Sequence, residues 1–249
     1  MNSKDPFSNV DINLDLPGIY FAEAWSQYKN GLKLYKKLTK SIRKHDNLAK
    51  LFNDLGKKNP KKADKMGTDV IWSLRELEIL YEPVVKHFAL STILLVGTAE
   101  AYINEVAEVL LSSRMYNEFD KLSLLGKWIF LPKICKIKVK WDVGSEPIQS
   151  LSKLISIRNR LMHFKGRRKK LDIFLTPRFI EEMDLVPDTI KRSFETVQES
   201  IKQFNLAWKG GFGPYWLYVE TREFRNPCFY LFDRKIGGVL YSGRIDKKK

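Results

Sequence analysis

Hydrophobic residues recur every three or four positions along most of the chain, and this spacing predicts a mainly α-helical protein. Within residues 20–55 the apolar positions alternate with many lysines, which is typical of an amphipathic helix. The stretch GKKNPKKADKMG interrupts that pattern, and residues 69–83 form a second helical run that is expected to stop at Pro83. Residues 84–113 are apolar around most of the helical circumference, so we predict that they form the central helix.

Three polar residues of the predicted central helix lie four positions apart, namely Glu100, Asn104 and Glu108. Side chains with this spacing share one helical face, so they make a polar stripe on an otherwise apolar rod. One interpretation is a solvated edge, because polar stripes on helices usually face water. The other interpretation is a role at an interface or in a catalytic cleft.

The second half of the chain predicts two further helices and a β-rich end. Residues 122–141 combine Pro132 with an alternating tail of apolar residues and lysines, and no regular element is predicted there. Residues 146–165 resume helical spacing up to Gly166, and residues 187–208 carry the cleanest amphipathic pattern in the chain. The aromatic and β-branched runs that follow are separated by Asn-Pro and Gly-Gly pairs, which predicts a small β-meander or hairpin.

These elements predict three parts: an N-terminal extension over residues 1–18, a helical bundle over residues 19–210 and a β-rich appendage over residues 211–249. The chain has 249 residues, 44% of them hydrophobic, which is enough to bury a real core. The expected fold class is therefore mainly α, a helical bundle with a small β-rich C-terminal appendage.

The charge balance narrows the class of partner. The chain has 44 Lys and Arg residues against 29 Asp and Glu residues, which gives a formal net charge of +15. A chain this basic favours a polyanion as its partner, with nucleic acid ahead of an anionic membrane surface.

The chain is expected to be cytoplasmic. Cys135 and Cys228 are too few for a disulfide framework, and residues 1–18 contain no apolar signal-peptide core. The apolar stretch that begins at Phe88 is interrupted by four polar or charged residues between positions 100 and 108. It falls short of the roughly 18 to 20 uninterrupted apolar residues that a membrane span needs, so we predict a buried helix and no membrane contact.

Composition and motifs argue against several kinds of site. The chain has three histidines and neither an HExxH nor a CxxC pattern, so no metal site and no cofactor is expected. The glycine cluster KGGFG lacks the Gly-Lys-Ser/Thr of a phosphate-binding loop, and no Gly-x-Ser-x-Gly occurs. A conventional nucleotide hydrolase or serine hydrolase is therefore not expected.

The stretch RNRLMH, near the end of the predicted helix over residues 146–165, carries the best candidate chemistry. Cleaving RNA through its 2′-hydroxyl requires a base that titrates near neutrality and a fixed cation for the charge on the phosphate. His163 and Arg158 are side chains of these two kinds, and Asn159 can orient the histidine or bind a phosphate oxygen. Arg158 and His163 diverge by about 140° on a straight helix, so they converge only at a helix end or across a symmetric dimer.

Basic residues cluster around this motif. Arg160 lies within it, and five more follow it: Lys165, Arg167, Arg168, Lys169 and Lys170. The segment leading into the same helix contains Lys127, Lys133, Lys136, Lys138 and Lys140. Charge runs are usually solvated faces, but the position of these runs favours a surface that binds RNA or DNA in a strongly salt-dependent way.

The stretch RNRLMH resembles the R-x(4 to 6)-H motif of HEPN domains, especially the form in which Asn follows the Arg. The stretch LVGTAEAYINEVAEVLL is similar to the long helix that precedes this motif, and GKWIFLPKI is similar to the region between them. The resemblance covers roughly residues 84–205 in the order of elements. The β-rich end and the N-terminal lysine-rich helix lie outside it.

The resemblance implies a HEPN-like helical bundle that forms a homodimer with its motif helices facing one another. It also implies a metal-independent endoribonuclease in which Arg158 and His163 are the catalytic pair and Asn159 is a supporting polar residue. Glu100 or Asn104 corresponds to a polar position of the preceding helix. Many HEPN proteins are toxins or anti-phage effectors held in check by a partner, so the implied partners are RNA and an antitoxin or regulatory protein.

Two other hypotheses remain open. In the first, the protein is a HEPN module that binds RNA or a nucleotide without cutting it and works with a partner protein. In the second, the motif is structural: Arg158 pairs with an acidic residue and His163 caps a helix end through a carbonyl. The intact motif favours the enzyme over the binding module, and the neighbouring basic run argues against the structural role.

Overall fold

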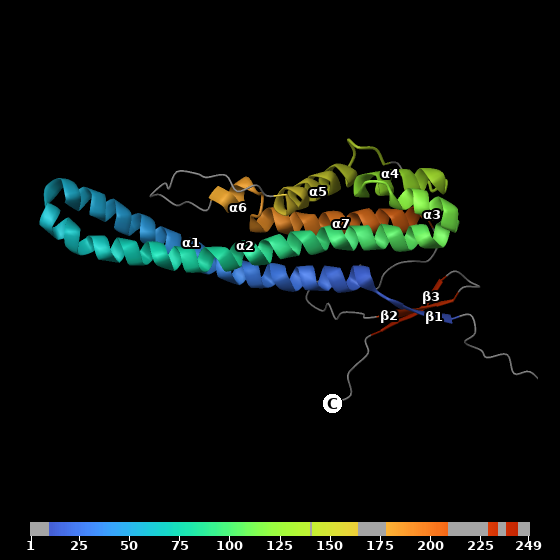
Figure 1. Ribbon diagram of the computed structural model, residues 1–249, viewed down its shortest axis with the longest axis horizontal. Coiled ribbons are helices and arrows are strands. Elements are labelled where there is room, and N and C mark those ends of the chain that lie inside the picture. The colour runs from blue at the N-terminus through green and yellow to red at the C-terminus, as the bar shows by residue number, and fades with distance from the viewer. Residues whose placement is uncertain (1–9, 140, 164–177, 209–228, 234–237, 244–249) are drawn as a thin grey trace, which may run out of the picture. The chain divides into compact units, whose positions relative to one another are not determined.

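The computed structural model describes residues 10–139, 141–163, 178–208, 229–233 and 238–243, and this part of the chain is mainly helical (Figure 1). The helices are α1 (Leu16–Lys58), α2 (Pro60–Leu110), α3 (Ser113–Asp120), α4 (Leu124–Ile134), α5 (Ile148–Met162), α6 (Arg178–Glu182) and α7 (Pro187–Trp208). The strands are β1 (Val10–Leu14), β2 (Phe229–Asp233) and β3 (Gly238–Gly243).

The chain divides into two compact units, and four helices pass from one unit into the other. The first unit comprises residues 1–25, 92–159 and 191–249, and the second comprises residues 26–91 and 160–190. The divisions fall inside α1, α2, α5 and α7, so neither unit is a separate stretch of the sequence.

An aromatic cluster forms the centre of the first unit. Trp128 of α4 has 0% of its surface exposed, and its ring centroid lies 5.9 Å from that of Tyr102 and 5.6 Å from that of Trp141. Phe204 of α7 meets Trp128 edge-on at 6.3 Å. Apolar residues of α5, including the fully buried Leu151, complete this core. Burial on this scale explains why α4 is helical, because packing of this face outweighs a weak local helical signal.

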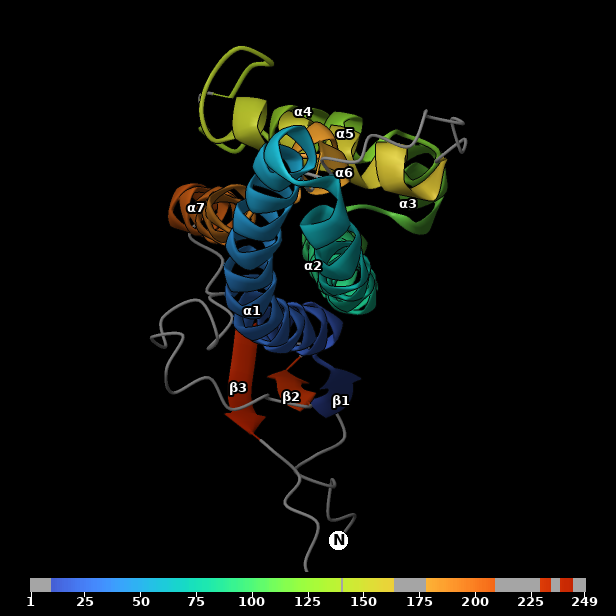
Figure 2. The same cartoon turned by 90° about the vertical axis from the view of Figure 1, so that its left-hand side faces the viewer.

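The three strands pair in the order β1-β2-β3, and both pairs are antiparallel (Figure 2). The register between β2 and β3 shifts between Leu231 and Phe232. Strand β1 and the start of α1 lie within the predicted N-terminal extension over residues 1–18, which is therefore partly regular structure. The separate appendage predicted over residues 211–249 stays a prediction, because most of that stretch lies outside the described residues.

The second unit is built on an antiparallel hairpin of α1 and α2. Buried residues of α1 recur at seven-residue intervals, as in Gly31, Leu38 and His45. Buried Leu77 and Val84 of α2 show the same interval. A seven-residue repeat keeps one face of each helix on the seam between them, as in a coiled coil. The amphipathic helix predicted over residues 20–55 is confirmed, and the structure extends it at both ends.

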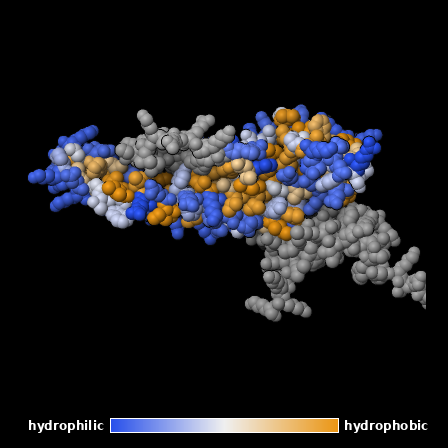
Figure 3. All heavy atoms as spheres, viewed as in Figure 1, coloured by the Kyte–Doolittle hydropathy of each residue, from blue (hydrophilic) through white to orange (hydrophobic). Residues whose placement is uncertain are grey.

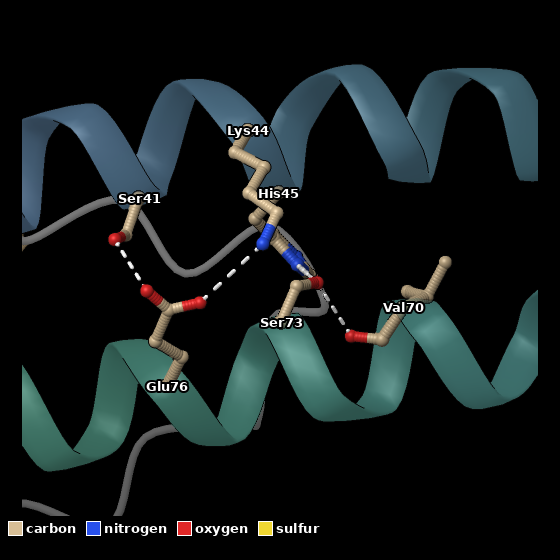
Figure 4. Close-up of polar contacts among 6 residues, drawn as sticks. All are labelled: Ser41, Lys44, His45, Val70, Ser73 and Glu76. Carbon is tan, nitrogen blue, oxygen red and sulfur yellow. Dashed lines mark hydrogen bonds and ion pairs between the residues drawn. The ribbon is translucent and has the colours of Figure 1, made fainter.

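Hydrogen-bonded polar side chains also lie in the hairpin (Figure 4). Ser73 Oγ donates to the carbonyl oxygen of Val70 at 2.8 Å, so it accepts a hydrogen bond from Nδ1 of His45, also at 2.8 Å. Glu76 accepts a hydrogen bond from Ser41 at 3.0 Å and pairs with Lys44 at 3.7 Å. These contacts fix the register of α1 against α2 along the seam.

One boundary predicted for the hairpin is shorter than expected, and another, at Pro83, is wrong. The predicted break over GKKNPKKADKMG is a single residue, Asn59, which lies between Lys58 and Pro60. The side chain of Asn59 accepts a hydrogen bond from the backbone nitrogen of Lys62 at 3.2 Å, and proline suits the first helical position because it needs no hydrogen at its nitrogen. Pro83 was expected to stop a helix, but it lies inside α2, where buried neighbours on both sides hold the helix together.

Residues 122–141 also differ from expectation, because they contain a regular helix. The hydroxyl oxygen of Ser123 accepts a hydrogen bond from the backbone nitrogen of Gly126 at 3.2 Å, which caps the start of α4. Pro132 lies inside α4 and is buried. Capping and burial of the apolar face therefore override the proline, whereas residues 135–139 of the alternating tail follow α4 without a regular element.

Among the helices that the structure describes, α2 is the one long and apolar enough, by length and composition, to cross a membrane. Its most apolar 18-residue window has a mean hydropathy of 1.5, and 33% of that window is buried. Core helices of soluble proteins have the same property, so this finding assigns α2 to neither environment.

Candidate functional site

Helix α5 holds the predicted motif at its C-terminal end. The helix buries Leu151, Leu154 and Ile157, and the motif begins at the residue that follows Ile157. A helix was predicted over residues 146–165, and the structure confirms the element while ending it at Met162. His163 therefore lies in the turn directly after the last helical residue.

Arg158 points toward an acidic side chain of α2. Its guanidinium Nη2 lies 3.9 Å from Oε2 of Glu100, and the two side chains are 28% and 44% exposed. An ion pair this open to water contributes little to stability, typically about 0–1 kcal/mol. Its structural effect is to place a carboxylate beside the guanidinium. The acidic partner of Arg158 is thus Glu100, a member of the polar stripe that the sequence predicted.

The other motif residues have different surroundings. Asn159 and His163 are both exposed. Arg158 and Asn159 belong to the first unit, whereas Arg160 and His163 belong to the second. Arg158 and His163 were expected to converge only at a helix end or across a symmetric dimer. Helix α5 ends at Met162, so His163 is not held in a continuing helix.

Arg160 is engaged by the short segment around α6. Its guanidinium donates to the carboxylate of Asp184 and, at 3.3 Å, to the carbonyl oxygen of Glu182. Its predicted contact with RNA stays a prediction. The remaining basic residues of that prediction lie outside the described residues: Lys165, Arg167, Arg168, Lys169 and Lys170.

A buried lysine forms a second polar cluster, which the sequence analysis did not recognise. The side chain of Lys127 on α4 is only 4% exposed. Its ammonium lies 2.7 Å from Oδ1 of Asp120 and 3.0 Å from Oδ1 of Asn104, and it sits 5.8 Å from the ring centroid of Phe119. Lys127 had been grouped with the basic residues that lead into the motif helix, and its burial removes it from any surface that contacts RNA.

A sequence signal for this cluster was available. Lys127 lies three positions after Leu124, one before Trp128 and four before Leu131, and all three of these neighbours are buried. A lysine among apolar residues at this spacing is on the core-facing side of its helix, where it needs an acidic or polar partner.

The polar stripe of α2 faces the helices that follow it in the first unit. Glu100 meets α5 through Arg158, and Asn104 meets α4 through Lys127. The pKa of Tyr116 on α3 is raised mainly by burial. The negative charges of Asp120 and then Glu108 raise it further. Glu100 and Asn104 thus contact neighbouring helices, the less expected of the two interpretations, whereas Glu108 is exposed.

In the first unit the motif thus consists of a guanidinium beside Glu100 and an exposed amide, and in the second unit the described motif residues include an exposed imidazole. Among the described residues no group of three or more His, Cys, Asp or Glu side chains is arranged to hold a metal ion. Comparisons with known proteins found no matching family model, no similar curated protein and no similar solved structure. The chemistry of the site must accordingly be argued from its own residues.

Proposed function

We propose that the protein is a HEPN-type, metal-independent endoribonuclease that acts as a homodimer, in the cytoplasm, as a toxin or anti-phage effector. In this proposal the helices form a HEPN-like bundle, and residues 211–249 add a small β-rich appendage. The observation that carries the proposal is the position of Arg158 and His163 at the end of α5. Arg158 lies beside Glu100 in the last turn of α5, while His163 lies exposed one residue beyond the helix.

The proposed reaction needs only groups of the chain and of the RNA. His163 takes the proton of the 2′-hydroxyl, and the resulting oxygen attacks the adjacent phosphorus. Arg158 stabilises the negative charge that builds on the phosphoryl oxygens. The bond from phosphorus to the 5′-oxygen breaks, and that oxygen leaves as a hydroxyl after receiving the proton that His163 took from the 2′-hydroxyl. The products are a 2′,3′-cyclic phosphate and a 5′-hydroxyl end, and DNA is not cut because it lacks the 2′-hydroxyl.

The supporting residues follow from their positions. Asn159 is exposed beside Arg158 and is suited to bind a phosphate oxygen or to orient His163. Glu100 is a positioning residue, because it contacts Arg158 and acts through it. The basic residues Arg160, Lys165, Arg167, Arg168, Lys169 and Lys170 contribute to RNA binding, and an antitoxin or regulatory protein is the proposed inhibitory partner.

The test is an RNA cleavage assay in EDTA with the purified protein. Wild type is expected to release 2′,3′-cyclic phosphate ends, and His163→Ala and Arg158→Ala are each expected to lower the rate by at least about 100-fold. Lys153→Ala is the matched control, because Lys153 is an exposed basic residue on the same helix. Cleavage that persists in both motif variants would remove the motif from the mechanism.

Glu100 provides a finer test of the same site. Glu100→Gln removes the charge that orients Arg158 and keeps the shape of the side chain. We expect kcat to fall about tenfold with KM nearly unchanged, because only the transition state depends on the orientation of Arg158. A change in KM alone would place Glu100 in substrate binding instead.

A second candidate function is an RNA- or nucleotide-binding HEPN module that works with a partner protein and does not cut. The ion pair between Arg158 and Glu100 favours it, because the guanidinium already has an anionic partner. Wild-type protein that binds RNA in the EDTA assay and leaves every RNA uncut would support this candidate over the enzyme.

A further inference from the structure

Helix α1 carries a continuous basic stripe on the face opposite the hairpin seam. It is formed by Lys29, Lys33, Lys36, Lys40, Arg43, Lys50 and Lys57, and all seven residues are exposed. Their spacing alternates between three and four positions, with Asn47 and Asp54 at the two positions not occupied by a basic residue. At 1.5 Å per residue, the 28 positions from Lys29 to Lys57 extend over about 42 Å.

The packing of the hairpin explains why this basic stripe faces outward. Tyr28, Leu38 and Ala49 are buried on the seam with α2, and the basic positions lie on the far side of the same helix. Figure 3 shows hydrophilic side chains gathered at the end of the hairpin where α1 passes into α2. The apolar surface of α1 is thus used inside the unit, and its charged surface is left to solvent.

The basic stripe is also not neutralised by the unit itself. Within the described part of the chain, the ion pair between the two hairpin helices joins Lys44 to Glu76, and Lys44 is not a member of the stripe. No carboxylate of the described residues lies within ion-pair distance of the seven stripe residues. Seven positive charges against the one carboxylate of Asp54 in the same line raise the local positive potential, and an anionic partner would relieve the repulsion.

We propose that the basic stripe of α1 is a binding surface for the phosphate backbone of RNA. Along the helix axis the cations lie about 5 Å apart from Lys29 to Arg43 and about 10 Å apart from Arg43 to Lys57, and such a line suits a linear polyanion. An acidic protein is a poorer fit, because the cores of protein interfaces are depleted of charged residues and rich in aromatic ones. A membrane is a poorer fit as well, because the exposed large hydrophobic residue of α1 is Leu51 alone, too little apolar surface to insert beside its lysines.

This surface extends the proposed function, and the choice of RNA over other polyanions rests on it. The RNA contacts predicted from the sequence lie around the motif, whereas the stripe lies on a helix outside the HEPN resemblance. The stripe contains no aromatic residue on which bases could stack, so its contacts carry no sequence preference. Its role is to increase the affinity for any RNA strand.

The experiment compares two triple variants that remove the same charges. Lys36, Lys40 and Arg43 are replaced by Gln in the stripe, and Lys153, Lys191 and Arg192 are replaced by Gln in the control. All six residues are exposed. Binding of a fluorescent, unstructured 2′-O-methyl RNA is measured by anisotropy at several salt concentrations. This RNA cannot be cleaved through its 2′-oxygen, so the result does not depend on whether the protein is a nuclease.

The stripe variant is expected to bind roughly 100-fold more weakly than wild type at about 0.1 M salt, with a salt slope smaller by about 2. The control variant is expected to lose less than tenfold. Equal losses in the two variants, or no loss in the stripe variant, would overturn the proposal. Replacing the same stripe lysines by Arg should keep wild-type affinity, which excludes misfolding as the cause of a loss.

Vesicles of phosphatidylcholine with and without phosphatidylserine form the second arm of the test. Wild type and the stripe variant are expected to sediment equally with both kinds of vesicle. A stripe variant that loses vesicle binding while its affinity for RNA is unchanged would assign the stripe to a membrane surface and overturn the assignment to RNA.

Discussion

Lys127 is a charged side chain in a part of the first unit that is otherwise apolar. An ammonium taken out of water is costly unless polar partners surround it, and here Asp120 and Asn104 supply them at 2.7 and 3.0 Å. The three residues come from α4, α3 and α2, so one ammonium ties three helices together. Asn104, which the sequence suggested as a supporting group of the catalytic motif, is held in this cluster.

Replacing Lys127 by Ala is expected to lower the free energy of unfolding by about 2–3 kcal/mol, because it leaves Asn104 without its partner and opens a cavity beside Phe119. Lys121→Ala is the matched control. Lys121 makes an ion pair of the same 2.7 Å length with Glu118, but both side chains are largely exposed, so we expect a change below about 1 kcal/mol. Urea denaturation measures both values, and similar values for the two variants would contradict this account.

Gly31 is a residue at which no side chain fits. A Cβ atom built on it would lie 2.5 Å from two ring atoms of Phe88, which is fully buried on α2. We expect Gly31→Ala to lower the free energy of unfolding by about 1–3 kcal/mol, because the ring must move in a packed seam. Gly56→Ala, near the end of the same helix and with no atom within 4 Å, should instead raise it by about 0.5–1 kcal/mol. Thermal or urea unfolding of the two variants distinguishes the signs.

At the scale of elements, α1, α5 and α7 follow from the periodicity of their sequences. The failures have a common physical cause. Pro83 and Pro132 each remove one backbone hydrogen bond, which is a local effect, whereas α2 and α4 are held by burial against residues distant in the sequence. The same contrast between local pattern and long-range packing holds for the site. The position of the motif at a helix end was predictable from the local pattern, but the partners of Arg158 and Lys127 depend on how α2 packs.

Two tyrosines of α1 make the stability of the hairpin dependent on alkaline pH. The pKa of Tyr28 is raised by burial and by the carboxylate of Asp188, and the pKa of Tyr35 is raised by burial and by Glu181 and Asp188. Because each folded pKa lies above the unfolded value of 10.0, the folded state binds these protons more tightly. The resulting stability is fully present below that unfolded value and is lost as the pH rises through the raised pKa.

The expected result is a free energy of unfolding that falls as the pH rises above about 10. The double variant with Tyr28→Phe and Tyr35→Phe keeps both rings and removes both ionisable groups, so its decline over the same pH range should be smaller. Urea titrations followed by circular dichroism provide the measurement. Parallel declines in the two proteins would mean that other groups cause the alkaline instability.

At the scale of the whole molecule, the charges are distributed unevenly. The chain has a formal net charge of +15, and seven of its basic residues form the exposed stripe of α1. Lys127, by contrast, is buried in the first unit and paired with Asp120, and Arg160 is paired with Asp184 within the second. Net charge alone therefore indicates a polyanion as partner, but it does not identify which cations meet it. Burial and ion pairing in the folded chain make that distinction.

The proposed homodimer makes a prediction about how two copies of the chain share the motif. If Arg158 of one copy works with His163 of the other, Arg158→Ala and His163→Ala proteins are each inactive, yet their mixture regains cleavage. With random exchange, half of the dimers contain one subunit of each kind and each of these has one intact site, so about a quarter of wild-type activity should return. Mixing Arg158→Ala with the double variant is the control, and it should regain nothing. If no activity returns although fluorescence energy transfer shows that subunits have exchanged, each subunit carries its own complete site.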